Sequence, residues 1–212
     1  MLHKAAFGSD SEALPVAPGE SKFQIKGIAY RGIVEFMKSQ GDSFLDDVLE
    51  SLPEDMREFC GQPFMAASWY DALPIRTFTR AVATRLGLPH VKYLRMGGAK
   101  QAAMDARTVY RHVMEGQPPF EVVRRQVTIG LRYYSFIEGG CVLTDENKGE
   151  VMARGMPQYL VSWFMPMQEA YTAETMRRSG AKNPVVRAEL KTSPNLEPLE
   201  PTEMVFKVSW EL

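Results

Sequence analysis

The last nine residues of the chain, "MVFKVSWEL" (204–212), alternate apolar and polar side chains more regularly than any other segment. A period of two is typical of a β-strand with one buried face. Such a strand predicts an antiparallel sheet that covers this face and leaves the other face solvated. The side chains predicted to point inward are those of Met204, Phe206, Val208, Trp210 and Leu212.

Two further segments supply strands for the same sheet. After Gly139-Gly140, the stretch "CVLTDENKGEVMARG" predicts a hairpin whose turn lies around Asn147, Lys148 and Gly149. The stretch "VVRAELK" predicts another strand, with Val186, Ala188 and Leu190 on one face.

A long helix is predicted between the hairpin and these last two strands. Its apolar residues recur from about Pro157 to Ser179, and Gly180 follows as a helix-ending residue. Pro166 falls inside this segment and should kink the helix or divide it, because proline lacks the N–H that a helix needs.

The segment from about residue 27 to residue 137 is predicted to be helical. In "SWYDALP", Ser68 and Asp71 are competing N-caps, and Pro74 lies at a tolerated first-turn position. Further along, the pair Gly97-Gly98 weakens a helix and is typical of a tight helix crossing or a kink.

The fold class is therefore α+β: a helical body followed by a small antiparallel sheet with one long inserted helix. A length of 212 residues fits one domain, which we place at residues 22–212. Residues 1–21 show no periodicity and are predicted to form a flexible N-terminal leader.

Charge and composition exclude several classes of function. The 25 basic and 26 acidic residues give a formal net charge of −1, so the chain has no field to attract nucleic acid. It lacks a signal-peptide apolar run, and no window approaches the roughly 18 apolar residues of a membrane span. With two widely separated cysteines, Cys60 and Cys141, it is predicted to be cytoplasmic.

Several stretches taken in order resemble a known family. They are "SLPEDMREF", "SWYDALP", "LRMGGAKQAAMDARTVYRHVMEG", "MRRSGAKNPVVRAELK" and "FKVSW", and together they span roughly residues 24–212. The chain resembles a myxobacterial paralogous family of unknown function. That family is distantly similar to haem–nitric-oxide-binding domains and to the vinyl-reductase-type and transport-particle-subunit folds. The resemblance implies a helical body joined to a small antiparallel sheet.

The same resemblance raises the question of haem. Haem–nitric-oxide-binding domains hold iron through a helical histidine, and a later Tyr-x-Ser-x-Arg triplet grips the haem propionates. His112 is the candidate for the histidine, and Tyr133 and Ser135 match the triplet. Ile137 stands in the place of the arginine, and it cannot make the charge-assisted contact that a carboxylate needs. We therefore expect no haem and no metal.

No catalytic motif is present either: no Gly-x-Ser-x-Gly, phosphate-binding loop or paired zinc-ligand spacing occurs. The enzyme classes with such motifs are therefore disfavoured, and no catalytic residue is assigned. Aromatic side chains near helix starts and on the glycine-containing helix are the candidates for lining a ligand pocket. Together with the histidine they are Trp69, Tyr70, Tyr93, Tyr110 and His112.

These observations favour a non-enzymatic cytoplasmic sensor or signalling module that binds a small apolar ligand and passes its state to a partner protein. The alternative is a structural adaptor with a filled core, which dimerises through an apolar helix face. A haem-based gas sensor is the third possibility.

Overall fold

The computed structural model describes residues 13–108, 111, 116–193 and 195–211, which form two compact units. The N-terminal unit contains residues 13–93 and the short segment Tyr133–Phe136. The C-terminal unit contains the described residues of 94–132 and 137–211. That residues 22–212 form one domain stays a prediction.

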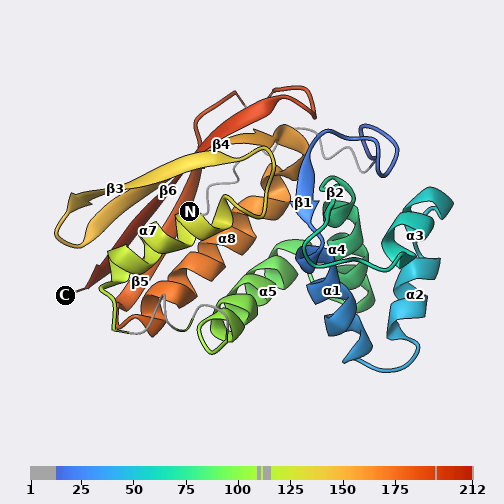
Figure 1. Ribbon diagram of the computed structural model, residues 1–212, viewed down its shortest axis with the longest axis horizontal. Helices are drawn as coiled ribbons and strands as arrows, with labels where there is room; N and C mark the ends of the chain where they lie inside the picture. Colours follow the sequence, from blue (N-terminus) through green and yellow to red (C-terminus); the bar gives the residue numbers. More distant parts are fainter. Residues whose placement is uncertain (1–12, 109–110, 112–115, 194, 212) are drawn as a thin grey trace. The chain divides into compact units, whose positions relative to one another are not determined.

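The N-terminal unit is a group of helices beside a small sheet (Figure 1). Strands β1 and β2 pair antiparallel, and Tyr134 forms an isolated bridge with Ile25 on the other edge of β1. Tyr30 and Phe78 are fully buried in its core. The elements are β1 (Gln24–Lys26), α1 (Ile28–Lys38), α2 (Phe44–Glu50), α3 (Glu54–Gly61), β2 (Trp69–Asp71), α4 (Pro74–Arg85) and the first turn of α5 (His90–Asp105).

Strand β2 corrects the prediction that residues 27–137 are helical throughout. Trp69–Asp71 is extended and pairs with Gln24–Lys26, and Tyr133–Phe136 is also not helical. A three-residue strand is too short to show a period of two in the sequence. Its conformation depends on a partner more than forty residues away, so local propensity cannot reveal it.

The C-terminal unit contains a four-stranded antiparallel sheet in the order β3-β4-β6-β5. Helices α7 and α8 lie against one face of this sheet (Figure 1). Helix α8 connects β4 to β5, and this confirms the predicted α+β fold with a long helix inserted in the sheet. The elements are α7 (Pro119–Gly130), β3 (Glu138–Asp145), β4 (Lys148–Pro157), α8 (Gln158–Arg178), β5 (Lys182–Leu190) and β6 (Pro201–Glu211).

The alternation in the last strand is confirmed from Phe206 onward, whereas Val205 is buried as well as its neighbours Met204 and Phe206. Met204, Phe206, Val208 and Trp210 are buried, and Lys207 is exposed. Leu212, also predicted to point inward, lies outside the described residues. The predicted hairpin joins β3 to β4 with its turn at residues 146–147, close to the predicted position.

Helix α8 runs from Gln158 to Arg178 without interruption. Of the two expected effects of Pro166, division of the helix does not occur. The turn before Pro166 is almost entirely buried, so tertiary packing holds the helix together where one backbone hydrogen bond is missing.

The predicted helix crossing at Gly97-Gly98 depends on one of the two glycines. A Cβ atom on Gly98 would lie 2.3 Å from the backbone oxygen of Met167 in α8, so α5 and α8 approach closely there. A Cβ atom on Gly97 would meet nothing within 4 Å. Substitutions at these two neighbouring glycines can therefore be compared to test the close packing of α5 and α8.

We predict that Gly98→Ala lowers the free energy of unfolding by about 1–3 kcal/mol, because the new methyl group forces two helix backbones apart. Gly97→Ala should leave it unchanged or raise it by up to about 1 kcal/mol, because alanine favours the helix. Urea denaturation of both variants measures this. Equal effects would contradict the close approach at Gly98.

Candidate functional site

The carboxylate of Asp71 organises the N-terminal unit. Asp71 ends β2 and is only 4% exposed. Its Oδ2 accepts the backbone N–H groups of Gly19 (3.0 Å) and Ser21 (3.2 Å), and its Oδ1 accepts the Ser21 hydroxyl (2.5 Å) and the Leu73 N–H (2.9 Å). Its backbone oxygen accepts the buried hydroxyl of Tyr30 (2.6 Å). One buried residue thus joins β2, α1, the start of α4 and the segment before β1.

Ser68 and Asp71 were predicted as competing N-caps, but neither is the N-cap of α4. Helix α4 begins at Pro74 with Leu73 as its N-cap, and Asp71 accepts the N–H of this N-cap residue. Gly19 and Ser21 belong to the segment predicted as a flexible leader, yet both are bonded to Asp71. The carboxylate therefore fixes the last residues of that segment.

A half-open hollow of about 480 Å³ lies beside this fixed segment. Its volume is within the range of small-molecule sites. Among the described residues that line it, the one with a charge is the exposed Asp55, whose Oδ1 accepts the N–H of Met56 (2.8 Å). A hollow of this kind suits a small apolar molecule with a hydrogen-bond donor or a positive charge. The lining residues are Ala13, Leu14, Val16, Ala17, Pro53, Asp55, Met56 and Thr77.

Sequence reasoning missed this hollow because half of its wall was assigned to the leader. The signal was the apolar pair Leu14 and Val16, which alternates with Pro15 in "ALPVAP". Because proline restricts the backbone, these residues could also have been predicted to form an ordered, extended segment. The other wall begins at Pro53 and Asp55, at the start of α3.

The predicted pocket residues that are described lie apart from the hollow. The Tyr70 hydroxyl accepts the Met65 N–H (2.8 Å) inside a cluster of aromatic rings. Trp69 is 40% exposed, and the Lys26 ammonium lies 3.8 Å from its ring centre. Burial raises the pKa of Tyr93 to about 12, and its ring contacts Phe36. Tyr110 and His112 lie outside the described residues. That these five bind a ligand stays a prediction.

Of the residues matched to the propionate-binding triplet, Ser135 bonds to the backbone and Ile137 has an apolar side chain. The Ser135 hydroxyl accepts the backbone N–H of Gln24 (3.0 Å), so it is engaged in holding the chain. Ile137 has no donor to offer. His90, on α5, has its Nε2 3.0 Å from the Thr79 hydroxyl. Over the described residues, no group of three or more His, Cys, Asp or Glu side chains is placed to hold a metal ion.

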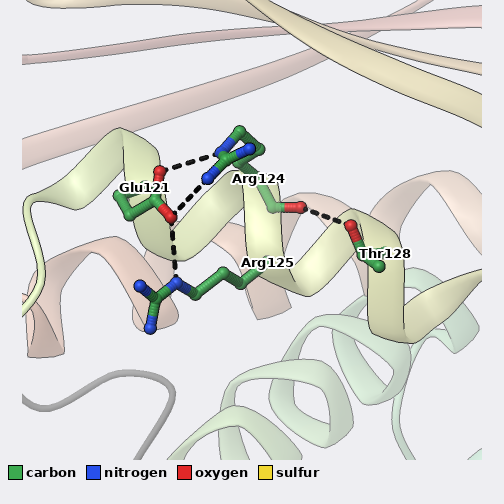
Figure 2. A network of polar contacts seen from close by, with 4 residues as sticks. All are labelled: Glu121, Arg124, Arg125 and Thr128. Carbon is green, nitrogen blue, oxygen red and sulfur yellow. Dashed lines mark hydrogen bonds and ion pairs between the residues drawn. The ribbon is translucent and has the colours of Figure 1, made fainter.

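Two arginine pairs are each bonded to one glutamate of their own helix, which offsets one of the two positive charges and occupies both guanidinium groups. In "EVVRR", Glu121 binds both Arg124 (2.7 Å) and Arg125 (2.9 Å), as Figure 2 shows. These bonds lower the pKa of Glu121 to about 2. In "ETMRR", Glu174 likewise binds both following arginines. Neither pair is therefore a ready phosphate or nucleic-acid site.

Neither cysteine has the character of a nucleophile. Burial raises the pKa of the Cys60 thiol to about 12, and Cys60 is 1% exposed. Burial also raises the pKa of Cys141. A nucleophilic cysteine needs a lowered pKa, because the thiolate is the reactive form.

The fold defines a class of protein. Neither a family model nor a curated protein matches the sequence. Solved structures do match: the chain has the fold of haem–nitric-oxide-binding (H-NOX) domains. An iron(II) unliganded H-NOX mutant of K. algicida has a TM-score of 0.63 at 10% identity, over 89% of this chain and 97% of that one.

A mutant H-NOX domain of T. tengcongensis has a TM-score of 0.59 at 11% identity, over 89% of this chain and 98% of that one. A structure from work on heme distortion in the H-NOX family gives 0.60 at 10% identity, over 89% and 96%. Identities this low establish the shared fold alone. In the described part of the chain, no helix is both long and apolar enough to cross a membrane.

We predict that Asp71→Asn lowers the free energy of unfolding by about 3 kcal/mol or more, because it removes a buried charge that accepts several hydrogen bonds. The matched control is Asp47→Asn, which breaks an exposed ion pair with Arg85 (2.7 Å) and should change stability by less than about 1 kcal/mol. Urea denaturation compares the two. Similar losses for both would show that Asp71 does not organise the unit.

Proposed function

We propose that the protein is a non-enzymatic sensor module that binds a small, mostly apolar molecule and passes its bound state to a partner protein. The observation that carries this proposal is the H-NOX fold, which extends over 89% of the chain. Two of the matching structures are described by their heme or their iron(II) state. By analogy, this fold serves as a frame for a bound group.

The proposed ligand is not haem. Support comes from Ile137, which replaces the arginine of the implied triplet. Burial also raises the pKa of Cys60 and of Cys141, which disfavours the thiolate form that would act as an iron ligand or nucleophile. We further propose membership in the myxobacterial paralogous family, on the motifs that resemble it.

The hollow beside residues 13–17 is the proposed binding site. Its lining is mostly aliphatic, and Asp55 supplies one negative charge at its wall. The favoured ligand class is therefore a small apolar amine or alcohol: the apolar body contacts Leu14 and Met56, and the polar group donates to Asp55. An amine gains more than an alcohol, because its hydrogen bond is charge-assisted.

The alternative is a structural adaptor that dimerises through a helix face. Helix α5 supports it, because Met96 and Met104 are each about half exposed and lie eight residues apart on one side of the helix. Exposed methionines are common at adaptable protein interfaces.

We predict that protein purified from haem-supplemented cells has no Soret band, since no arginine grips the propionates. The measurement is the absorption spectrum, normalised to protein by the 280 nm absorbance. His112→Ala is the matched variant, and its spectrum should be identical. A stoichiometric Soret band that His112→Ala abolishes would replace this proposal with a haem sensor.

We predict that hexylamine raises the melting temperature more than hexanol or hexanoate does, because only the amine makes a charge-assisted hydrogen bond to Asp55. Asp55→Asn should remove the preference for the amine. Ala17→Trp should fill the hollow and abolish all three effects, whereas Ala67→Trp, at an exposed alanine outside the hollow, should preserve them. Thermal-shift measurements decide this.

Native mass spectrometry of freshly purified protein separates the sensor from the adaptor. A co-purifying small molecule that Ala17→Trp excludes supports the sensor. A ligand-free dimer, together with no response to the three probes, would favour the adaptor.

A further inference from the structure

The two edges of the sheet in the C-terminal unit are built differently. Strand β5 forms one edge, and several features block the addition of a further strand there. It carries Lys182, Pro184 and Arg187, and its ladder is irregular between Lys182 and Val185. The outward N–H of Ala188 is already bonded to the Glu169 carboxylate of α8 (2.8 Å). Charges, proline and covering side chains are the usual means of protecting a sheet edge.

Strand β3 forms the other edge, and its ladder with β4 also shifts register, between Leu143 and Asp145 near one end. Its six central residues, "GGCVLT" (139–144), contain no charge and no proline. Val142 is 49% exposed and Leu143 is 48% exposed. Within the described part of the chain, β3 pairs with β4 alone. An eight-residue strand therefore presents unpaired backbone donors and acceptors beside exposed apolar side chains, which is the geometry that accepts an added strand.

The charges at the two ends of β3 indicate what kind of strand fits. Glu138 lies at one end, and Asp145 and the exposed Glu146 lie at the other. Lys148 lies 3.4 Å from Asp145 and offsets one of these charges. Arg154, the cross-strand neighbour of Glu138, is bonded to Glu203 instead.

A second copy of the chain fits this edge poorly. Two copies of β3 related by a twofold axis would pair antiparallel, so Glu138 of one copy would lie near Asp145 and Glu146 of the other. Like charges opposite each other destabilise a strand pair. A segment with basic ends would instead meet an acidic residue at each end.

We propose that the β3 edge binds an extended segment of a partner protein, apolar in its centre and with a lysine or arginine at each end. The segment adds a fifth strand to the sheet. Backbone hydrogen bonds supply the affinity, and Val142, Leu143 and the acidic ends select the partner. This inference does not depend on the proposed ligand site, which lies in the other unit.

The test uses the full chain and a synthetic fluorescent peptide of alternating valine and threonine with a lysine at each end. Fluorescence anisotropy should give a Kd below about 100 μM, and hydrogen exchange should slow in residues 138–145. Val142→Lys should weaken binding at least tenfold, because it places a charge on the edge. Val185→Lys is the matched control: Val185 is 45% exposed on the protected edge, and binding should not change.

Two further peptides test the chemistry. A central proline should abolish binding, because it removes a ladder donor, and glutamate ends should weaken it at least tenfold. Equal binding of these peptides, an equal effect of Val185→Lys, or no binding of the lysine peptide up to about 1 mM would overturn the proposal.

A dimer in analytical ultracentrifugation that Val142→Lys converts to a monomer would assign the edge to a second copy instead. None of these titrations needs a small ligand, so their failure is distinct from failure of the sensor proposal.

Discussion

The N-terminal unit depends on one buried carboxylate. Asp71 has almost no contact with solvent, so each hydrogen bond that it accepts replaces one that water would otherwise supply. Its partners come from before β1, from α1 and from the start of α4. If the carboxylate were lost, the buried N–H of Leu73 and the partly buried donors of Gly19 and Ser21 would lose their acceptor. The wall of the hollow formed by residues 13–17 adjoins Gly19 and Ser21, so the candidate site depends on the same anchor.

Several carboxylates in this protein form ion pairs with basic residues of the same helix or of a neighbouring strand. Glu121 and Glu174 each bind two arginines one turn later, and Glu189 binds Lys191 and Lys207 on the outer face of the sheet. The pKa of Glu189 falls to about 2 for this reason. Asp55 in the hollow and Glu138 on the β3 edge stand out because they lie beside exposed apolar surface. The two proposed sites are therefore each an apolar surface with local acidic charge.

The H-NOX fold of this chain does not by itself require haem. The fold is set by the sheet, the inserted helix and close backbone contacts such as the one at Gly98, none of which needs a bound group. Propionate binding needs particular donors, and Ile137, in the place of the triplet arginine, has none. A fold can persist while its site changes, because packing and binding chemistry use different residues.

The sequence by itself determined the elements whose patterns are long. The alternation of β6, the hairpin and the continuous helix before Gly180 repeat over many residues, so local periodicity was sufficient to predict them and the α+β class. Gly97-Gly98 was also recognised as a crossing, although only the structure shows that Gly98 alone makes the contact.

Only the tertiary structure decided the short strand β2, the role of Asp71 and the hollow. Trp69–Asp71 is extended because Gln24–Lys26 pairs with it, and the residues around Gly19 are ordered because Asp71 accepts their N–H groups. The candidate site combines residues 13–17 with residues 53–77, which no local pattern connects. Each of these features is a contact between distant segments, and such a contact has no period in the sequence from which it could be predicted.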